Sequence, residues 1–209
     1  QVNGAALASG ATSINGLTDG VVTGGSVGLG TDALANDDGT NNNNTAVGTS
    51  ALQLNTTGNN NTATGRGSLQ SNTFGSFNTA TGVWAMSANT TGQRNTATGW
   101  VALYSNTTGY NNTASGYHAL KDNTTAGYNT ASGCKALRRN TTGTFNTAIG
   151  ASSLQLNTTG EKNTSSGAYA LRDNTTGASN TANGFDALKL NTTGAKNIGL
   201  GYGAGDAIT

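Results

Sequence analysis

The chain has 209 residues, of which 32 are glycine and none is proline, and only 9% of its residues are charged. A net charge of +1 excludes the strong positive field with which proteins attract nucleic acid. No apolar run approaches the roughly 18 residues that predict a membrane-spanning helix, so neither nucleic acid nor membrane insertion is expected. The hydrophobic fraction of 33% is low for one globular core, yet the small net charge is not typical of disorder either.

In chain order, the sequence divides into four parts. Residues 1–25 lie outside any period and are expected to form an N-terminal cap or junction. Residues 26–43 form an imperfect first unit with one extra residue, residues 44–196 contain nine regular units, and residues 197–209 form a truncated tenth. The start at Gln1 and the end partway through a unit favour a fragment or a processed product.

The regular units share the consensus N-T-A-x-G-x-x-A-L-x-x-N-T-T-G-x-x. They begin at Asn44, Asn61, Asn78, Asn95, Asn112, Asn129, Asn146, Asn163 and Asn180. No insertion or deletion interrupts them, although loops of globular proteins tolerate length changes. A strict period therefore indicates that each unit stacks on its neighbour in register.

A unit rich in glycine, threonine and asparagine cannot sustain a helix, and seventeen is no multiple of a heptad. Short segments such as T-A-T and A-L-Y suit strands, and the glycines at unit positions five and fifteen are expected to supply positive φ, helped by the asparagines at positions one and twelve. The prediction is an all-β protein: a parallel β-solenoid, or β-roll, of about ten stacked 17-residue coils.

Stacking in register places identical side chains above one another, about 4.8 Å apart. The position-one asparagines are then expected to form amide ladders and the threonines hydroxyl ladders, with each side chain bonded to its own copy in the next coil. The N-T-T triplet at position twelve is formally a glycosylation acceptor, but glycans cannot fit at so close a spacing.

One leucine and two alanines per coil make a thin apolar core. Ordering seventeen residues costs far more than their burial contributes, so association of chains is expected to bury a second face. A homotrimeric fibre is the preferred assembly, with a monomer as the alternative.

The N-T-A-x-G…A-L…N-T-T-G units resemble the β-roll repeats of trimeric autotransporter adhesin heads, and more closely the repeat regions of phage tail fibres. In such fibres a segment like INGLTDGVVTGGSVGLG precedes the array and one like NIGLGYGAGDAIT follows it. The resemblance implies an extracellular location, on a virion tail fibre or a bacterial cell surface, and implies no catalytic residue. Adhesin heads use a shorter period, so their coil shape does not carry over.

Candidate contact residues occupy the variable unit positions six and seven, which are expected to face solvent. They are Trp84, Trp100, Tyr117, His118, Tyr169 and Phe185. Stacked along a rod, they would form an aromatic stripe that either contacts a carbohydrate or protein receptor or packs between chains of an oligomer. Charged residues at positions ten and eleven, such as Lys121 and Asp122, are expected to form cross-coil ion pairs on a solvated face; contact with an anionic glycan is the alternative.

No metal site, cofactor site or catalytic constellation is expected. His118 is the single histidine, and no carboxylate or thiol lies at ligand spacing from it. The favoured function is a structural or adhesive fibre segment. The alternative is an ice-binding solenoid, because T-x-T arrays can match an ice lattice, although the second threonine changes to serine, isoleucine or asparagine in later coils. A solenoid enzyme such as a polysaccharide lyase is disfavoured, since no unit carries an inserted loop or an acidic cluster.

Overall fold

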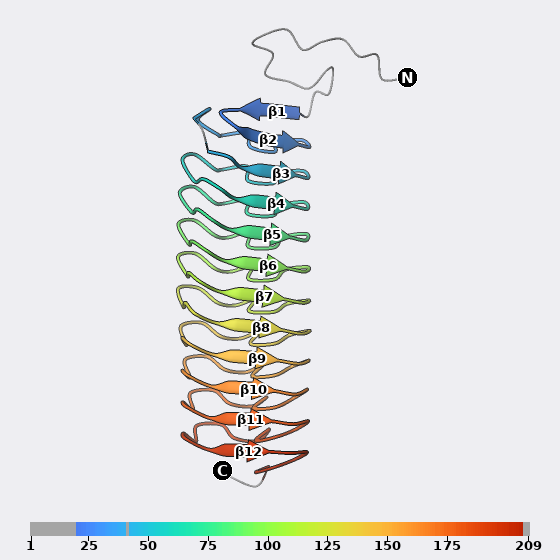
Figure 1. Ribbon diagram of the computed structural model, residues 1–209, viewed down its shortest axis with the longest axis vertical. Coiled ribbons are helices and arrows are strands. Elements are labelled where there is room, and N and C mark those ends of the chain that lie inside the picture. Colours follow the sequence, from blue (N-terminus) through green and yellow to red (C-terminus); the bar gives the residue numbers. More distant parts are fainter. Residues whose placement is uncertain (1–19, 41, 207–209) are drawn as a thin grey trace, which may run out of the picture.

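The chain forms one column of stacked coils, each carrying one short strand (Figure 1). The computed structural model of the protein describes residues 20–40 and 42–206. The strands are β1 (Gly20–Thr23), β2 (Ser26–Leu29), β3 (Thr45–Val47), β4 (Thr62–Thr64), β5 (Thr79–Thr81), β6 (Thr96–Thr98), β7 (Thr113–Ser115), β8 (Thr130–Ser132), β9 (Thr147–Ile149), β10 (Thr164–Ser166), β11 (Thr181–Asn183) and β12 (Ile198–Leu200). In these residues no helix is long and apolar enough to cross a membrane.

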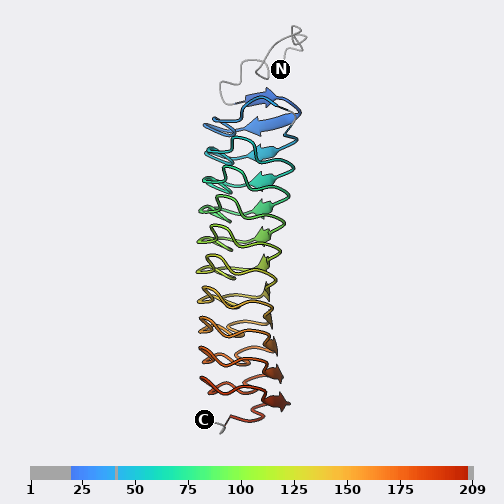
Figure 2. The same cartoon turned by 90° about the vertical axis from the view of Figure 1, so that its left-hand side faces the viewer.

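The twelve strands of the described residues form a single sheet in which spatial order follows chain order. From β2 to β12 every neighbouring pair is parallel and in register, with Thr45 opposite Thr62 and Ala46 opposite Ala63, for example. The predicted all-β parallel solenoid is therefore confirmed. Ten steps of about 4.8 Å between these eleven strands make a column of about 48 Å. Figure 2 shows the strands on one side of the column and the turns on the other.

The first two strands close one end of the sheet. β1 pairs with β2 in antiparallel register, through a turn at Gly24 and Gly25, where φ is +44° and +81°. Because β1 covers the edge of β2, that end of the parallel sheet presents no row of unpaired backbone groups from β2. Of the segment expected to form a cap, residues 1–19 lie outside the described residues.

The core runs the length of the column inside a single chain. Each three-residue strand places its central residue inward and its outer residues outward, as in β5, where Ala80 is buried between exposed Thr79 and Thr81. The alanine and leucine at unit positions eight and nine complete one continuous apolar cluster. Met86 replaces a leucine and remains fully buried. The leucines are therefore enclosed without a second chain.

The segment after the strand is a pair of turns, not the second strand expected at A-L-Y. In the coil of β6, the N–H of Ala102 donates to the carbonyl of Gly99, and the N–H of Asn106 donates to that of Leu103. Apart from Gly67, positions seven, nine and seventeen of the nine regular units hold non-glycine residues with φ between about +49° and +61°, including Val101 and Leu103. Hydrogen bonds to adjacent coils hold this left-handed backbone in place, since the Val101 N–H donates to Val83 and the Leu103 N–H to Ala119.

Glycine occupies position five of every regular unit and position fifteen of all but one, where Ala126 replaces it, and the two positions favour glycine for different reasons. At position five φ is positive, +129° at Gly99, as predicted. At position fifteen φ is not positive, so that part of the prediction is wrong. A Cβ on Gly58 would instead lie 2.5 Å from Oδ1 of Asn55 and 2.9 Å from Nδ2 of Asn72, and even closer to the backbone of the next coil. The asparagines at positions one and twelve likewise have no positive φ. Their side chains are buried and bridge neighbouring coils instead.

Two columns of buried asparagines fasten coil to coil. At position twelve, Nδ2 of Asn72 donates to Oδ1 of Asn55 at 2.9 Å and to the carbonyl of Gly75 in its own coil, also at 2.9 Å. At position one, the backbone N–H of Asn78 donates to Oδ1 of Asn61 at 3.0 Å, while its Nδ2 donates to the carbonyl of Gly92 at 2.8 Å. Both columns thus converge on the carbonyl at position fifteen.

The position-thirteen threonines bond differently from the expected hydroxyl ladder. Oγ1 of Thr90 donates to the backbone carbonyl of Thr107 at 3.1 Å, and Oγ1 of Thr107 to that of Thr124 at 3.2 Å. Each hydroxyl is therefore satisfied by main chain of the next coil. The asparagines of the N-T-T triplets are completely buried, which excludes glycans on them in the folded protein.

Candidate functional site

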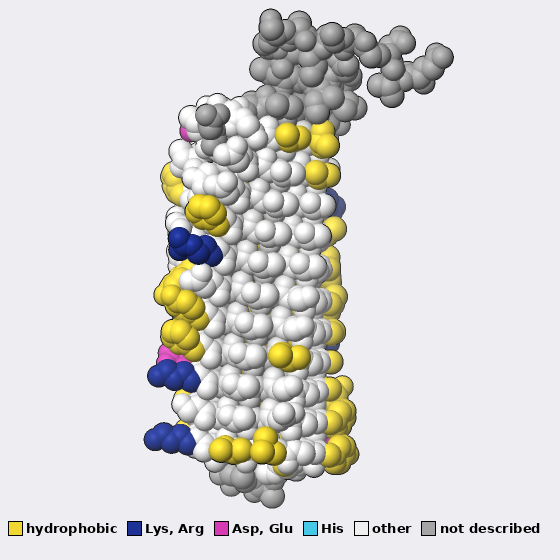
Figure 3. Space-filling model, in the orientation of Figure 1, with side chains coloured by type: hydrophobic (Ala, Val, Ile, Leu, Met, Phe, Trp, Pro, Cys, Tyr) yellow, Lys and Arg dark blue, Asp and Glu magenta, His cyan; other side chains and the backbone are white. Residues whose placement is uncertain are grey.

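The aromatic residues predicted at positions six and seven lie on one corner of the column, directly after the strands. Trp100, Tyr117 and Phe185 are 46%, 43% and 44% exposed, and Tyr169 is 37% exposed. Trp84 and His118 are half-buried. Figure 3 shows hydrophobic side chains along both margins of the sheet-bearing face, which is itself mainly uncharged and polar.

The predicted stripe is divided into two groups. Trp100 stacks with Tyr117 and with His118, with ring centroids 5.1 Å apart in each case, and Tyr117 lies 4.0 Å from His118. Farther along, Tyr169 meets Phe185 edge-on, and Phe185 stacks on Tyr202 at 5.6 Å. The two coils between carry small or charged residues at positions six and seven: Cys134, Lys135, Ala151 and Ser152. Trp84 belongs to the first group and lies under the guanidinium of Arg66, 5.2 Å from the ring centroid.

A pocket of about 390 Å³ opens in the first group. It is lined by Trp84, Trp100, Val101, Tyr104, His118 and Lys121. Val101 follows Trp84 and precedes His118 in the column of position-seven residues, and it is only 8% exposed. Because valine is smaller than its two neighbours in that column, a hollow forms between their rings. We call this hollow the Trp84–His118 notch.

His118 lies at the rim of the notch, where its surroundings favour the neutral imidazole. Burial lowers its pKa, and the nearby charges of Arg138, Lys121 and Lys135 lower it further, while Asp122 acts in the opposite direction. Its Nδ1 is buried and has no hydrogen-bond partner in the part of the chain that the structure describes. The residues that the structure describes contain no group of three or more His, Cys, Asp or Glu side chains that could hold a metal ion.

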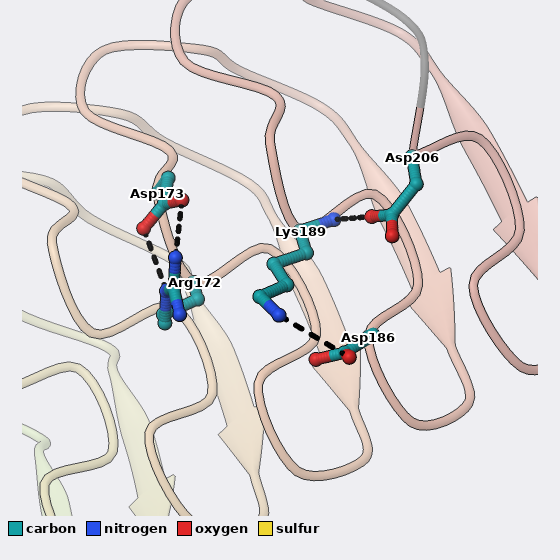
Figure 4. Close-up of polar contacts among 5 residues, drawn as sticks. All are labelled: Arg172, Asp173, Asp186, Lys189 and Asp206. Atoms are coloured by element: carbon teal, nitrogen blue, oxygen red, sulfur yellow. Dashed lines mark hydrogen bonds and ion pairs between the residues drawn. The ribbon is translucent and has the colours of Figure 1, made fainter.

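Charged residues at positions ten and eleven pair within coils, not across them as expected. Lys121 Nζ lies 3.0 Å from Oδ1 of Asp122, with about a third of each side chain exposed. Farther along, Arg172 donates from Nε and Nη2 to the two oxygens of Asp173, both at 2.7 Å, which raises the pKa of Arg172 (Figure 4).

Near the C-terminal end, one lysine joins two coils. Lys189 Nζ lies 3.2 Å from Oδ2 of Asp186, and the Lys189 backbone N–H donates to Oδ1 of Asp206, one coil farther on (Figure 4). The cross-coil bond therefore uses the main chain of lysine and not its charge.

Sequence reasoning missed two lining residues and a second aromatic column. Val101 and Tyr104 were not singled out, whereas Lys121 was named as part of a solvated charged face, with contact to an anionic glycan as the alternative. The second column lies at positions sixteen and seventeen, where Tyr110 meets Tyr128 edge-on at 5.2 Å and Tyr128 stacks on Phe145 at 4.8 Å. The recurrence of aromatic residues at position seventeen was a usable signal for that column.

Comparison with protein-family models, with curated proteins and with solved structures finds no match to this chain.

Proposed function

We propose that the chain is a segment of an extracellular fibre, a rigid rod whose aromatic corner contacts a receptor. The observation that carries the proposal is the unbroken stack: eleven parallel strands follow one another in register without an inserted loop. Each coil contacts only its neighbours, as in other solenoids, so the stack extends in one direction and can hold a contact surface at a distance from its base. The resemblance to tail-fibre and adhesin repeats supports the same role and a location on a virion or bacterial surface.

Receptor contact is assigned to the corner and not to the flat face. Trp100, Tyr117 and Phe185 expose nearly half of their surface. Because the backbone that carries them is rigid, a receptor that contacts these side chains costs the protein little conformational entropy. A cell-surface glycan or protein is the expected partner. The proposed role needs no cofactor and no catalytic step.

Assembly into a homotrimer is part of the proposal. The enclosed leucine column removes one reason for it, because a single chain already buries its own core. What supports association is the amount of exposed aromatic surface, including Phe77 and Phe145 at 52% and 53% exposure on the second column.

The test combines shape, mass and binding. Negative-stain microscopy should show thin rods, and light scattering at micromolar concentration should give three times the chain mass of 20.7 kDa. Binding to a glycan array should fall sharply in the Trp84→Ala/Trp100→Ala variant and persist in the Thr176→Ala control. A mass of one chain would overturn the trimer, and unchanged binding in the double variant would leave only the shaft role.

Ice binding is the second candidate, favoured by one surface. On β4, β5 and β6 the outward pairs are Thr62 with Thr64, Thr79 with Thr81, and Thr96 with Thr98, all exposed and in register. The pattern then becomes irregular, because the second outward-facing residue is Ile149 on β9 and Asn183 on β11. Thermal hysteresis at millimolar protein, lost in Thr79→Tyr, would support this function; its absence would reject it.

A further inference from the structure

The Trp84–His118 notch has the size and lining of a small-ligand site. Its volume of about 390 Å³ falls in the range of about 300–1,000 Å³ that is usual for ligand pockets. Aromatic and aliphatic side chains make most of the wall, and polar groups are few: the Tyr104 hydroxyl, the His118 imidazole and the Lys121 ammonium. Flat rings beside a small number of hydrogen-bonding groups suit a pyranose, which presents C–H groups on its faces and hydroxyls at its edge.

The surroundings of the notch are cationic although the whole chain is nearly neutral. Residues 112–145 contain four cationic side chains, Lys121, Lys135, Arg138 and Arg139, against the single carboxylate of Asp122. Three of these cations, Lys121, Lys135 and Arg138, lie near enough to His118 to lower its pKa. Nε of Arg138 is buried and finds no hydrogen-bond partner among residues 20–40 and 42–206. The local field therefore favours an anionic group on the ligand.

Lys121 can turn toward such a group because its present partner holds it weakly. One contact, at 3.0 Å to Oδ1 of Asp122, holds the ammonium, and the two side chains keep 29% and 34% of their surface in solvent, where screening weakens the pair. Asp122 and an incoming carboxylate would thus compete for the same cation.

We propose that the Trp84–His118 notch binds one sugar residue that bears an acidic group, with the ring against Trp84 and Trp100 and the acid on Lys121. The sugar ring would occupy the hollow above Val101, and Tyr104 and His118 would bond its hydroxyls. The inference deepens the proposed receptor contact and rests on it, since it names the chemistry of the ligand at that corner.

Tryptophan fluorescence is a direct probe of this site. The chain contains two tryptophans, and both line the notch. The full chain is titrated with trigalacturonic acid and, as the matched neutral probe, with the trimethyl ester of the same trisaccharide. A glucose 6-sulfate arm distinguishes sulfate from carboxylate, and a capped Asp-Phe-Asp peptide distinguishes an acidic peptide from a saccharide.

The expected result is a fluorescence change with the acid at an affinity about tenfold or more above that of the ester, the factor associated with one charge-assisted hydrogen bond. Sodium chloride should weaken binding of the acid and leave the ester unaffected. Equal binding of acid and ester, stronger binding of the peptide, or no spectral change would each overturn the proposal.

Variants that change surface charges and keep both tryptophans test the acidic-sugar inference separately. They leave the buried core and the fluorescent probes in place, so their result does not depend on loss of folding or on loss of the aromatic contact surface. Lys121→Gln should lower acid binding to the level of the ester, and Asp122→Asn should raise it severalfold by removing the competing carboxylate. Lys162→Gln, a cation on another corner, is the matched control and should change nothing. If Lys121→Gln and Asp122→Asn have no effect while the array binding still depends on Trp84 and Trp100, the acidic-sugar inference fails and the receptor-contact proposal stands.

Discussion

The backbone N–H of Asn112 donates to the side-chain oxygen of Asn95, seventeen residues earlier, at 2.9 Å. The same bond joins the position-one asparagines of each neighbouring pair of coils described, so a single side chain defines both the period and the register. A one-residue insertion would misplace this acceptor as well as the position-fifteen carbonyl that receives the side-chain amide, which for Asn112 is that of Ala126. The absence of insertions in the sequence thus has a local chemical cause.

Removing one amide from the other asparagine column should destabilise the protein strongly. Nδ2 of Asn106 donates to Asn89 at 2.8 Å and to the carbonyl of Gly109 at 3.0 Å, and its oxygen accepts from Asn123 at 2.9 Å. Asn106→Ala leaves Oδ1 of Asn89 and one N–H of the Asn123 amide buried without this partner, at about 1–3 kcal/mol for each unsatisfied group, while the Gly109 carbonyl still accepts from Asn95. We expect a loss of about 2–4 kcal/mol in urea denaturation, with Thr108→Ala, on the exposed side of the same turn, within about 0.5 kcal/mol of the wild type. Equal effects of the two variants would contradict this role.

Position-five glycine should be required for contact between coils as well as for φ. Gly99 and Gly201 both have positive φ, +129° and +112°. A Cβ on Gly99 would lie 2.7 Å from the carbonyl oxygen of Gly116, whereas one on Gly201 would meet no atom of the described residues within 4 Å. Both alanine variants suffer backbone strain of about 1–3 kcal/mol, but only Gly99→Ala must also push two coils apart. Its melting temperature should fall well below that of Gly201→Ala, and similar values would show that strain alone matters.

The leucine column should behave as a packed core. Leu103 is completely buried, so Leu103→Ala should lower the free energy of unfolding by about 2–5 kcal/mol. Met86→Leu is the control, because it restores the consensus residue at equal volume and should change stability by less than about 1.5 kcal/mol. Amide hydrogen exchange should show the loss of protection centred on the coil of β6 and its neighbours, since coils contact only adjacent coils. Uniform deprotection along the whole chain would contradict this local coupling.

The sequence was sufficient for the coil and its register, because both follow from which residues recur at seventeen-residue spacing. It was insufficient for the path of the backbone within a coil. The run of alanine and leucine at positions eight and nine has strand-like composition, yet Leu103 adopts φ of +51°, because an inter-coil bond from its N–H to Ala119 outweighs the ordinary preference of leucine. Such bonds exist only once coils are stacked, so local propensity does not reveal them.

The candidate site was predictable in the identity of its aromatic residues but not in its shape. Trp84, Trp100 and His118 could be assigned to one corner by their position in the unit. The notch depends on the order of the large and the small residue at positions six and seven. One coil has Val83 at position six and Trp84 at position seven, and the next has the reverse order, Trp100 and then Val101. Its depth and the approach of Tyr104 and Lys121 require the actual turn geometry.

Stability should depend on pH through His118. The pKa of this residue is lowered by burial first, and then by Arg138, Lys121 and Lys135 against the opposing Asp122. Between that lowered value and the ordinary value of 6.5, the unfolded chain binds more protons than the folded protein, so the free energy of unfolding falls as the pH decreases through about 6.5 and levels off below the folded pKa.

The pH dependence is measured by urea denaturation between pH 8 and pH 5, with His118→Gln as the control. The glutamine variant keeps a polar side chain at the rim of the notch and does not titrate, so its curve should be flatter in this window. If the wild type and the variant lost stability in parallel, the dependence would arise from other groups. If the wild type instead gained stability on acidification, the imidazolium would be favoured in the folded protein and the assignment of a neutral His118 would be wrong.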